Sequence, residues 1–246
     1  NDIDTSVTIS FQPGAGGTCN LQGGNSANAE TENRQAFLTF GDKSWGSVKV
    51  GKDLGIFGST AILNDMTLLG VGAGNATVGA TTTLGGIGTG YIYADWIGQI
   101  AYTTPNMNGF QLTAGITQPW NAGGILNGNS AASSGSTDEF GFQGQGSFSW
   151  TGDFAGKVWA GFFSQEVTNI GVANAAGVVV DGSSDRASAF EAGVSTSIYN
   201  INLVAYAYSG EGVGTTALLS QGFDTTGSAR DSDGGYVQGT YVIPTG

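Results

Sequence analysis

The sequence predicts an all-β protein that forms a transmembrane antiparallel β-barrel, and three observations support this fold class. Glycine supplies 44 of the 246 residues and charged residues make up only 11%, against roughly 25% in soluble globular domains. Apolar residues reach 39%, but they are dispersed, and no run of them approaches the roughly 18 residues of a membrane-spanning helix. Polar and apolar residues instead alternate with a period of two, which places them on opposite faces of a strand.

The alternation is clearest in residues 139–150. The apolar or small set is Phe140, Phe142, Gly144, Gly146, Phe148 and Trp150, and the polar set is Gln143, Gln145, Ser147 and Ser149. The first face suits lipid and the second suits water, as in a barrel that encloses a pore.

Similar but weaker alternation gives about ten strands in all, each close to the roughly 9 to 11 residues of a tilted membrane strand. The other segments are residues 3–12, 34–40, 47–52, 96–103, 110–117, 157–165, 190–198, 201–208 and 236–242. We expect residues 1–246 to form one barrel domain.

Short and long connections alternate between these strands. The short ones lie at residues 42–45, 105–108, 151–153 and 199–200, and the long ones at 13–33, 53–90, 119–138, 166–185 and 210–233. Short periplasmic turns and long outer loops are typical of bacterial outer-membrane barrels. Aromatic residues lie beside the short turns, as an interfacial girdle requires, although such residues favour strands in any β-protein. They are Phe40, Trp45, Tyr102, Phe110, Trp150, Phe154 and Tyr199.

Composition excludes several classes of function. The net charge is −12 with only seven Lys and Arg, so we expect no nucleic-acid partner. Histidine is absent and Cys19 is the single cysteine, which removes His-assisted catalysis and any disulfide within the chain. Residues 181–185 and 231–233 are rich in oxygen ligands but match no complete calcium loop. Residues 70–74 and 85–90 lack the lysine of a phosphate-binding loop, and we expect no cofactor and no enzyme.

Four motifs resemble the trimeric general-diffusion porins of Gram-negative bacteria. Residues 34–41 and 45–52, Arg-Gln-Ala-Phe-Leu-Thr-Phe-Gly and Trp-Gly-Ser-Val-Lys-Val-Gly-Lys, are similar to that family's Arg-x-Ala-aromatic strand and its Gly-x-Val-x-x-Gly-Arg strand. Residues 102–105 with Gly109-Phe110 resemble its Tyr-x-Ser-Pro turn, and residues 234–241 resemble a later strand.

The resemblance implies a passive channel for ions and small hydrophilic solutes in the outer membrane. It implies a homotrimer in contact with lipid and lipopolysaccharide. Residues 3–12 would be the third strand and 236–242 about the twelfth of roughly sixteen, so the chain is expected to be an incomplete barrel. Residues 53–90 would be the loop that folds inward and narrows the pore.

The same resemblance places candidate pore residues on that loop and on the facing wall. Residues 59–69 of that loop are expected to form a short helix, and Asp65 would face the lumen, although an Asp in a solvated loop or helix cap fits equally well. Lys52 stands in place of the family's wall arginine. It shares the parity of the valines beside it, so only a bulge near Gly51 would turn it inward, whereas Lys49 faces water by alternation.

Four further charged residues lie in expected strands, where a charge should face the lumen. They are Arg34, Lys157, Arg186 and Glu191. Arg34 and Arg186 fit equally well above the bilayer, at the bases of loops. The acidic outer loops predict a modest preference for cations.

Two alternatives remain open from the residues alone. One is a complete smaller outer-membrane barrel, and the other is a secreted β-rich adhesin or structural protein. An enzyme built on a barrel is disfavoured, because acids such as Asp138 and Glu139 form no convincing acid-base pair.

Overall fold

The computed structural model describes residues 3–13, 31–68, 85–120, 139–170, 182–224 and 227–244. Within them, ten strands form one sheet in sequence order, and every pair is antiparallel. The strands are β1 Asp4–Pro13, β2 Thr31–Asp42, β3 Gly46–Leu54, β4 Trp96–Thr103, β5 Phe110–Thr117, β6 Gly141–Trp150, β7 Phe154–Ile170, β8 Ser183–Ile198, β9 Ile201–Glu211 and β10 Asp231–Tyr241. The all-β antiparallel fold class is confirmed. No helix among the described residues is long and apolar enough to span a membrane.

Strands β7 and β8 are longer than the alternation predicts. Their pairing continues through Glu166 opposite Arg186 and Val167 opposite Asp185. Polar residues occupy the outer face there, so the apolar signal ends before the hydrogen-bonded ladder does. The sequence pattern therefore records where a strand contacts an apolar medium, and it underestimates the strand itself.

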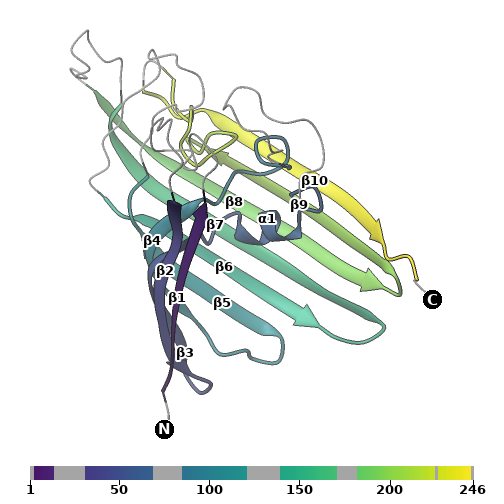
Figure 1. Ribbon diagram of the computed structural model, residues 1–246. Helices are drawn as coiled ribbons and strands as arrows, with labels where there is room; N and C mark the ends of the chain where they lie inside the picture. The colour runs from purple at the N-terminus through teal and green to yellow at the C-terminus, as the bar shows by residue number, and fades with distance from the viewer. Residues whose placement is uncertain are drawn as a thin grey trace.

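Short turns join β2 to β3, β4 to β5, β6 to β7 and β8 to β9 at one end of the sheet (Figure 1). In the first turn, the Asp42 carboxylate accepts hydrogen bonds from the Ser44 amide and hydroxyl. In the second, Asn106 Oδ1 accepts from the Gly109 amide at 2.7 Å. Side chains that bond to nearby backbone amides favour such tight turns.

The two faces of the sheet differ as the alternation predicts. On β6, the outward Phe142 is 48% exposed, whereas its neighbour Gln143 points inward and is only 1% exposed. Other outward side chains with large exposure include Val7, Ile100, Leu112, Phe154, Phe190, Leu203 and Val237. The outer face is apolar, whereas the inner face carries amides and hydroxyls beside buried aromatic side chains; this difference suits lipid outside and water inside.

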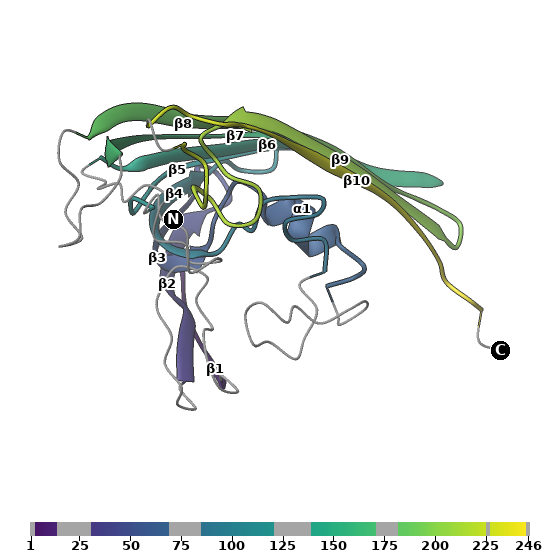
Figure 2. The ribbon, with the colours of Figure 1, turned by 90° about the horizontal axis from the view of Figure 1, so that it is seen from above.

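The sheet curves around chain segments that lie on its concave side, among them the short helix α1 Ser59–Asn64 (Figure 2). The buried cluster joins inward side chains of the sheet, such as Trp159, Phe163 and Tyr206, to residues of the inserted segments, such as Phe57 and Leu218. Among the described residues, β1 pairs only with β2 and β10 only with β9, so the sheet is open. Cys19 lies outside the described residues.

Candidate pore constriction

The connection between β3 and β4 folds into the concave side of the sheet. Its described residues, 55–68 and 85–95, are called the inner loop below. They cover most of the segment expected at 53–90, and residues 69–84 lie outside the described part of the chain. Helix α1 ends at Asn64, whereas the helix expected from the sequence extends to residue 69.

The entry of α1 is fixed to the wall through two consecutive backbone amides. The Phe57 amide donates to Gln143 Oε1 at 2.8 Å, and the Gly58 amide donates to Glu191 Oε2 at 3.0 Å. Gly58 has φ 78°, a left-handed conformation that glycine adopts without strain. That conformation sets the direction in which α1 continues from the two amides, which side-chain oxygens of β6 and β8 satisfy.

Glu191 is the most heavily bonded acid of this wall. It is 3% exposed and accepts three hydrogen bonds, from the Gly58 amide, from Tyr206 Oη at 2.9 Å and from Gln145 Nε2 at 3.1 Å. A buried carboxylate is tolerated only with such partners. Glu191 therefore joins three strands, β6, β8 and β9, to the inner loop.

The far end of α1 is held by β10. Tyr236 Oη donates to the Ala61 carbonyl at 2.7 Å. The Gln238 amide donates to the Asn64 carbonyl and accepts from the Met66 amide at 3.1 Å. The helix carbonyls that lack a partner within the helix thus find donors on the wall.

Asp65 organises the inner loop from within. One carboxylate oxygen accepts from the Thr67 amide and hydroxyl, and the other accepts from the Gly86 amide and Tyr91 Oη, both at 2.7 Å. Burial alone would raise the pKa of Asp65, but these hydrogen bonds outweigh it and hold the pKa below its ordinary value. Burial and the adjacent Asp65 carboxylate raise the pKa of Tyr91.

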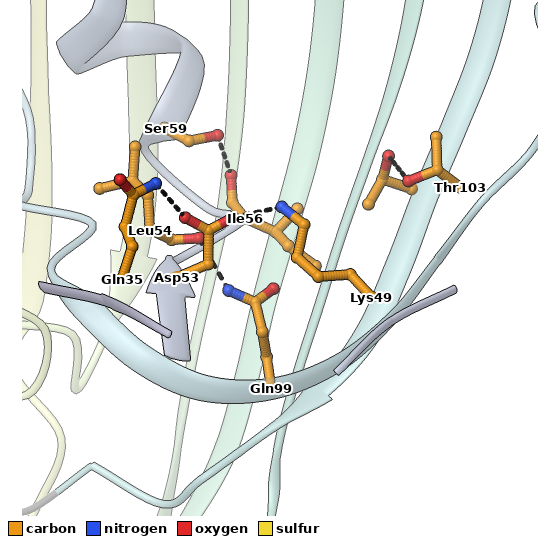
Figure 3. Close-up of polar contacts among 9 residues, drawn as sticks. Gln35, Lys49, Asp53, Leu54, Ile56, Ser59, Gln99 and Thr103 are labelled. Atoms are coloured by element: carbon orange, nitrogen blue, oxygen red, sulfur yellow. Dashed lines mark hydrogen bonds and ion pairs between the residues drawn. The ribbon is translucent and has the colours of Figure 1, made fainter. Parts of the chain in front are cut away.

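A cluster of polar side chains lies at the base of the inner loop (Figure 3). The Asp53 carboxylate, at the end of β3, accepts from Gln35 Nε2 at 2.9 Å and forms an ion pair with Lys49. Gln99 Nε2 donates to the Leu54 carbonyl at 2.9 Å. The Lys49 ammonium also lies 4.8 Å from the centre of the Phe37 ring, which is a cation–π geometry. A positive and a negative charge therefore cancel at this point of the wall.

Residues 2–245 match the sequence model of a protein family described as Gram-negative porin. The chain belongs to this family. No curated protein matches it.

The strand register of this porin places three of the expected pore residues on the inner face: Lys49, Lys157 and Glu191. Lys157 lies between Ser149 and Ser195, on the part of the wall nearer the short turns. Asp65 lies on the concave side of the sheet, but both oxygens of its carboxylate accept hydrogen bonds from within the inner loop.

Two other expected pore residues lie on the outer face. Lys52 pairs with Ala36 and Gly98 and shares the face of Val50, because the register runs unbroken past Gly51. Arg186 is paired with Glu166 at 3.0 Å on the outer side of β7 and β8. Arg34 lies at a bulge of β2, opposite the step between Ser10 and Phe11 of β1, so the register alone assigns it no face.

Sequence reasoning missed the wall residues that hold the inner loop. These are Gln143, Gln145, Tyr206, Tyr236 and Gln238, together with Asp53 at the loop's base. Their signal was the polar face of the alternation, which predicts an inward direction but no partner. The partner is a loop distant in sequence, and period-two alternation carries no information about it.

Proposed function

We propose that this porin is a passive diffusion channel for ions and small hydrophilic solutes across the outer membrane, and not an enzyme. The observation that carries the proposal is the curved sheet itself, with an apolar outer face, an inner face that carries polar and charged side chains, and a loop folded against the inner wall. A loop held inside a barrel narrows the aqueous path without providing a shaped pocket. Discrimination then depends on width and on the electric field.

The positive charge of Lys49 at the constriction is compensated. Lys49 is paired with Asp53, and the Glu191 carboxylate is buried in hydrogen bonds. The acidic balance of the whole chain, −12, therefore dominates the potential that an ion meets. A modest preference for cations follows from this balance.

Conductance in a planar lipid bilayer tests the channel. We expect stepwise increases in current as single pores insert, and a reversal potential across a KCl gradient that favours K⁺ modestly. An electrically silent protein that is folded and inserted contradicts the channel. A reversal potential that favours Cl⁻ contradicts the cation preference alone.

We further propose a homotrimer that contacts outer-membrane lipid and lipopolysaccharide, as in the porins that the chain resembles. The position of Lys52 supports an assembly, because a charge among Val50, Ala36 and Gly98 on the outer face is costly against hydrocarbon. A neighbouring subunit over β2 to β4 removes that contact. Analytical ultracentrifugation in detergent measures the mass of the assembly, and the mass of a single chain contradicts the trimer.

A further inference from the structure

The connection between β9 and β10 also folds into the barrel. Its described residues, 212–224 and 227–230, are called the brace below. Five apolar residues of the brace are at most 2% exposed; they are Val213, Ala217, Leu218, Leu219 and Phe223. An outer loop in water does not bury such side chains, so this segment belongs to the interior.

The brace is fixed to the wall at both of its ends. The Gly212 amide donates to the Arg230 carbonyl at 2.9 Å, which closes the segment on itself. The Ser232 hydroxyl of β10 donates to the Gly214 carbonyl, and the Ala229 amide donates to Asp185 Oδ2 of β8 at 3.0 Å. These bonds give the brace a defined position against β8 and β10.

The brace contacts the returning limb of the inner loop, residues 85–95. The Tyr93 amide donates to the Thr216 carbonyl at 2.7 Å, and Tyr93 forms a parallel bridge with Ala217. Gly88 approaches Thr216 so closely that a methyl group on Gly88 would lie 2.8 Å from the Thr216 hydroxyl. The two segments also share one buried cluster, in which Tyr91 and Ile92 accompany Leu218.

The returning limb also packs against the wall, where the Tyr91 ring lies edge-on to Tyr236 of β10 with 5.8 Å between the ring centres. The wall bonds of Gln143, Glu191 and Gln238 hold the outgoing limb, residues 55–68. Asp65 joins the limbs at Gly86 and Tyr91, and the Gly55 amide joins them at the Asp95 carbonyl. Between these two points, Tyr93 is bonded to the brace.

We propose that the brace positions the inner loop, so that the constriction of this porin is set by two loops rather than one. This inference rests on the proposed channel. Val213, Ala217, Leu218 and Phe223 act as positioning residues through packing, and the Thr216 carbonyl fixes the register of the returning limb. Loosening the brace frees that limb to move within the lumen.

The test loosens the brace and then locks it again. The double variant Leu218→Ala, Phe223→Ala removes buried contacts of the brace, and Phe190→Ala, on the exposed outer face of β8, is the matched control. We expect the double variant to show higher unitary conductance and more open-channel noise, and the control to match the wild type. Hydrogen exchange should quicken at the Tyr93 amide and stay slow at the Gly58 amide.

A disulfide provides the lock. A side chain on Gly88 would place its Cβ 3.4 Å from that of Thr216, close to the spacing of cystine. In a Cys19→Ser background, Gly88→Cys with Thr216→Cys is added to the loosened brace, and the reduced form serves as reference because Gly88 has φ 77°. Oxidation should restore the wild-type conductance and noise, and reduction should abolish the rescue.

The proposal is overturned if the folded double variant keeps wild-type conductance, noise and Tyr93 protection. If that variant does not fold, the cysteine pair is placed in the otherwise native brace. Rapid disulfide formation with quieter open-channel current supports the brace, and failure to form the disulfide overturns it. A wild-type protein without conductance refutes the channel instead, and the Tyr93 exchange still reports on the brace.

Discussion

At the scale of single residues, Glu191 is the wall residue whose replacement by alanine should have the clearest effect on stability. Its carboxylate accepts hydrogen bonds from the Gly58 backbone amide, the Tyr206 hydroxyl and the Gln145 side-chain amide. Glu191→Ala leaves those buried donors unpaired, and we expect it to lower the free energy of unfolding by about 1–3 kcal/mol and to raise unitary conductance. Glu191→Gln keeps one carbonyl acceptor and should be intermediate. Thermal unfolding in detergent measures the stability, with Glu166→Ala at the exposed outer pair as a near-neutral control.

We expect the Lys49–Asp53 pair to affect ion selectivity more than stability. Asp53→Asn leaves the Lys49 ammonium without its counter-charge on the inner wall, so the reversal potential should shift toward anions. The effect on unfolding should stay within about 1 kcal/mol, because the Lys49 side chain is partly exposed. Lys49→Gln should shift the potential the opposite way, and the double variant should return near the wild type. Equal potentials in all four proteins would show that the conducting path avoids this wall.

At the scale of elements, the inner loop should loosen in acid. The pKa of Asp65 in the folded protein lies below its ordinary value of 3.8, so its hydrogen bonds contribute fully above that pH. They are lost as the pH falls from there through the lower folded pKa. We expect the protection of the Gly86 amide, which is its exchange rate relative to that of an unfolded chain at the same pH, to fall below about pH 4. In the Asp65→Asn variant, the Gly86 amide should be less protected at neutral pH, and the loss of protection in acid should disappear. An unchanged loss of protection in that variant would show that another acid causes it.

Strand elements were the part of this fold that the sequence predicted well. The alternation in residues 96–103 and 110–117 matches β4 and β5 end to end, because both faces of these strands meet distinct environments over their whole length. Residues 157–165 underestimate β7, Phe154–Ile170, because its outer face becomes polar beyond Phe162. Ladder hydrogen bonds are independent of side-chain polarity, so the pattern does not locate their end.

The inserted segments were predicted less completely. The resemblance to general-diffusion porins predicted that residues 53–90 turn inward, but not that residues 210–233 do so as well. The apolar residues Leu218, Leu219 and Phe223 were the available signal, since a loop in water has no reason to concentrate them. The resemblance predicted that Lys52 faces the pore, because it stands in place of the family's wall arginine. Its alternation with the neighbouring valines indicated the outer face instead, and the strand register places it there.

At the scale of the whole molecule, the two faces of the sheet predict opposite responses to the same charge. Val194 of β8 points outward and Asn202 of β9 points inward, beside Ser197 and Thr240. Val194→Arg should destabilise the folded protein in lipid vesicles by about 2–4 kcal/mol if it lies near the bilayer centre, and by less toward either interface. Asn202→Arg should cost little, because its guanidinium remains in water. Denaturant titration of vesicle-inserted protein measures both, and an equal or reversed ranking contradicts a sheet with lipid outside and water inside.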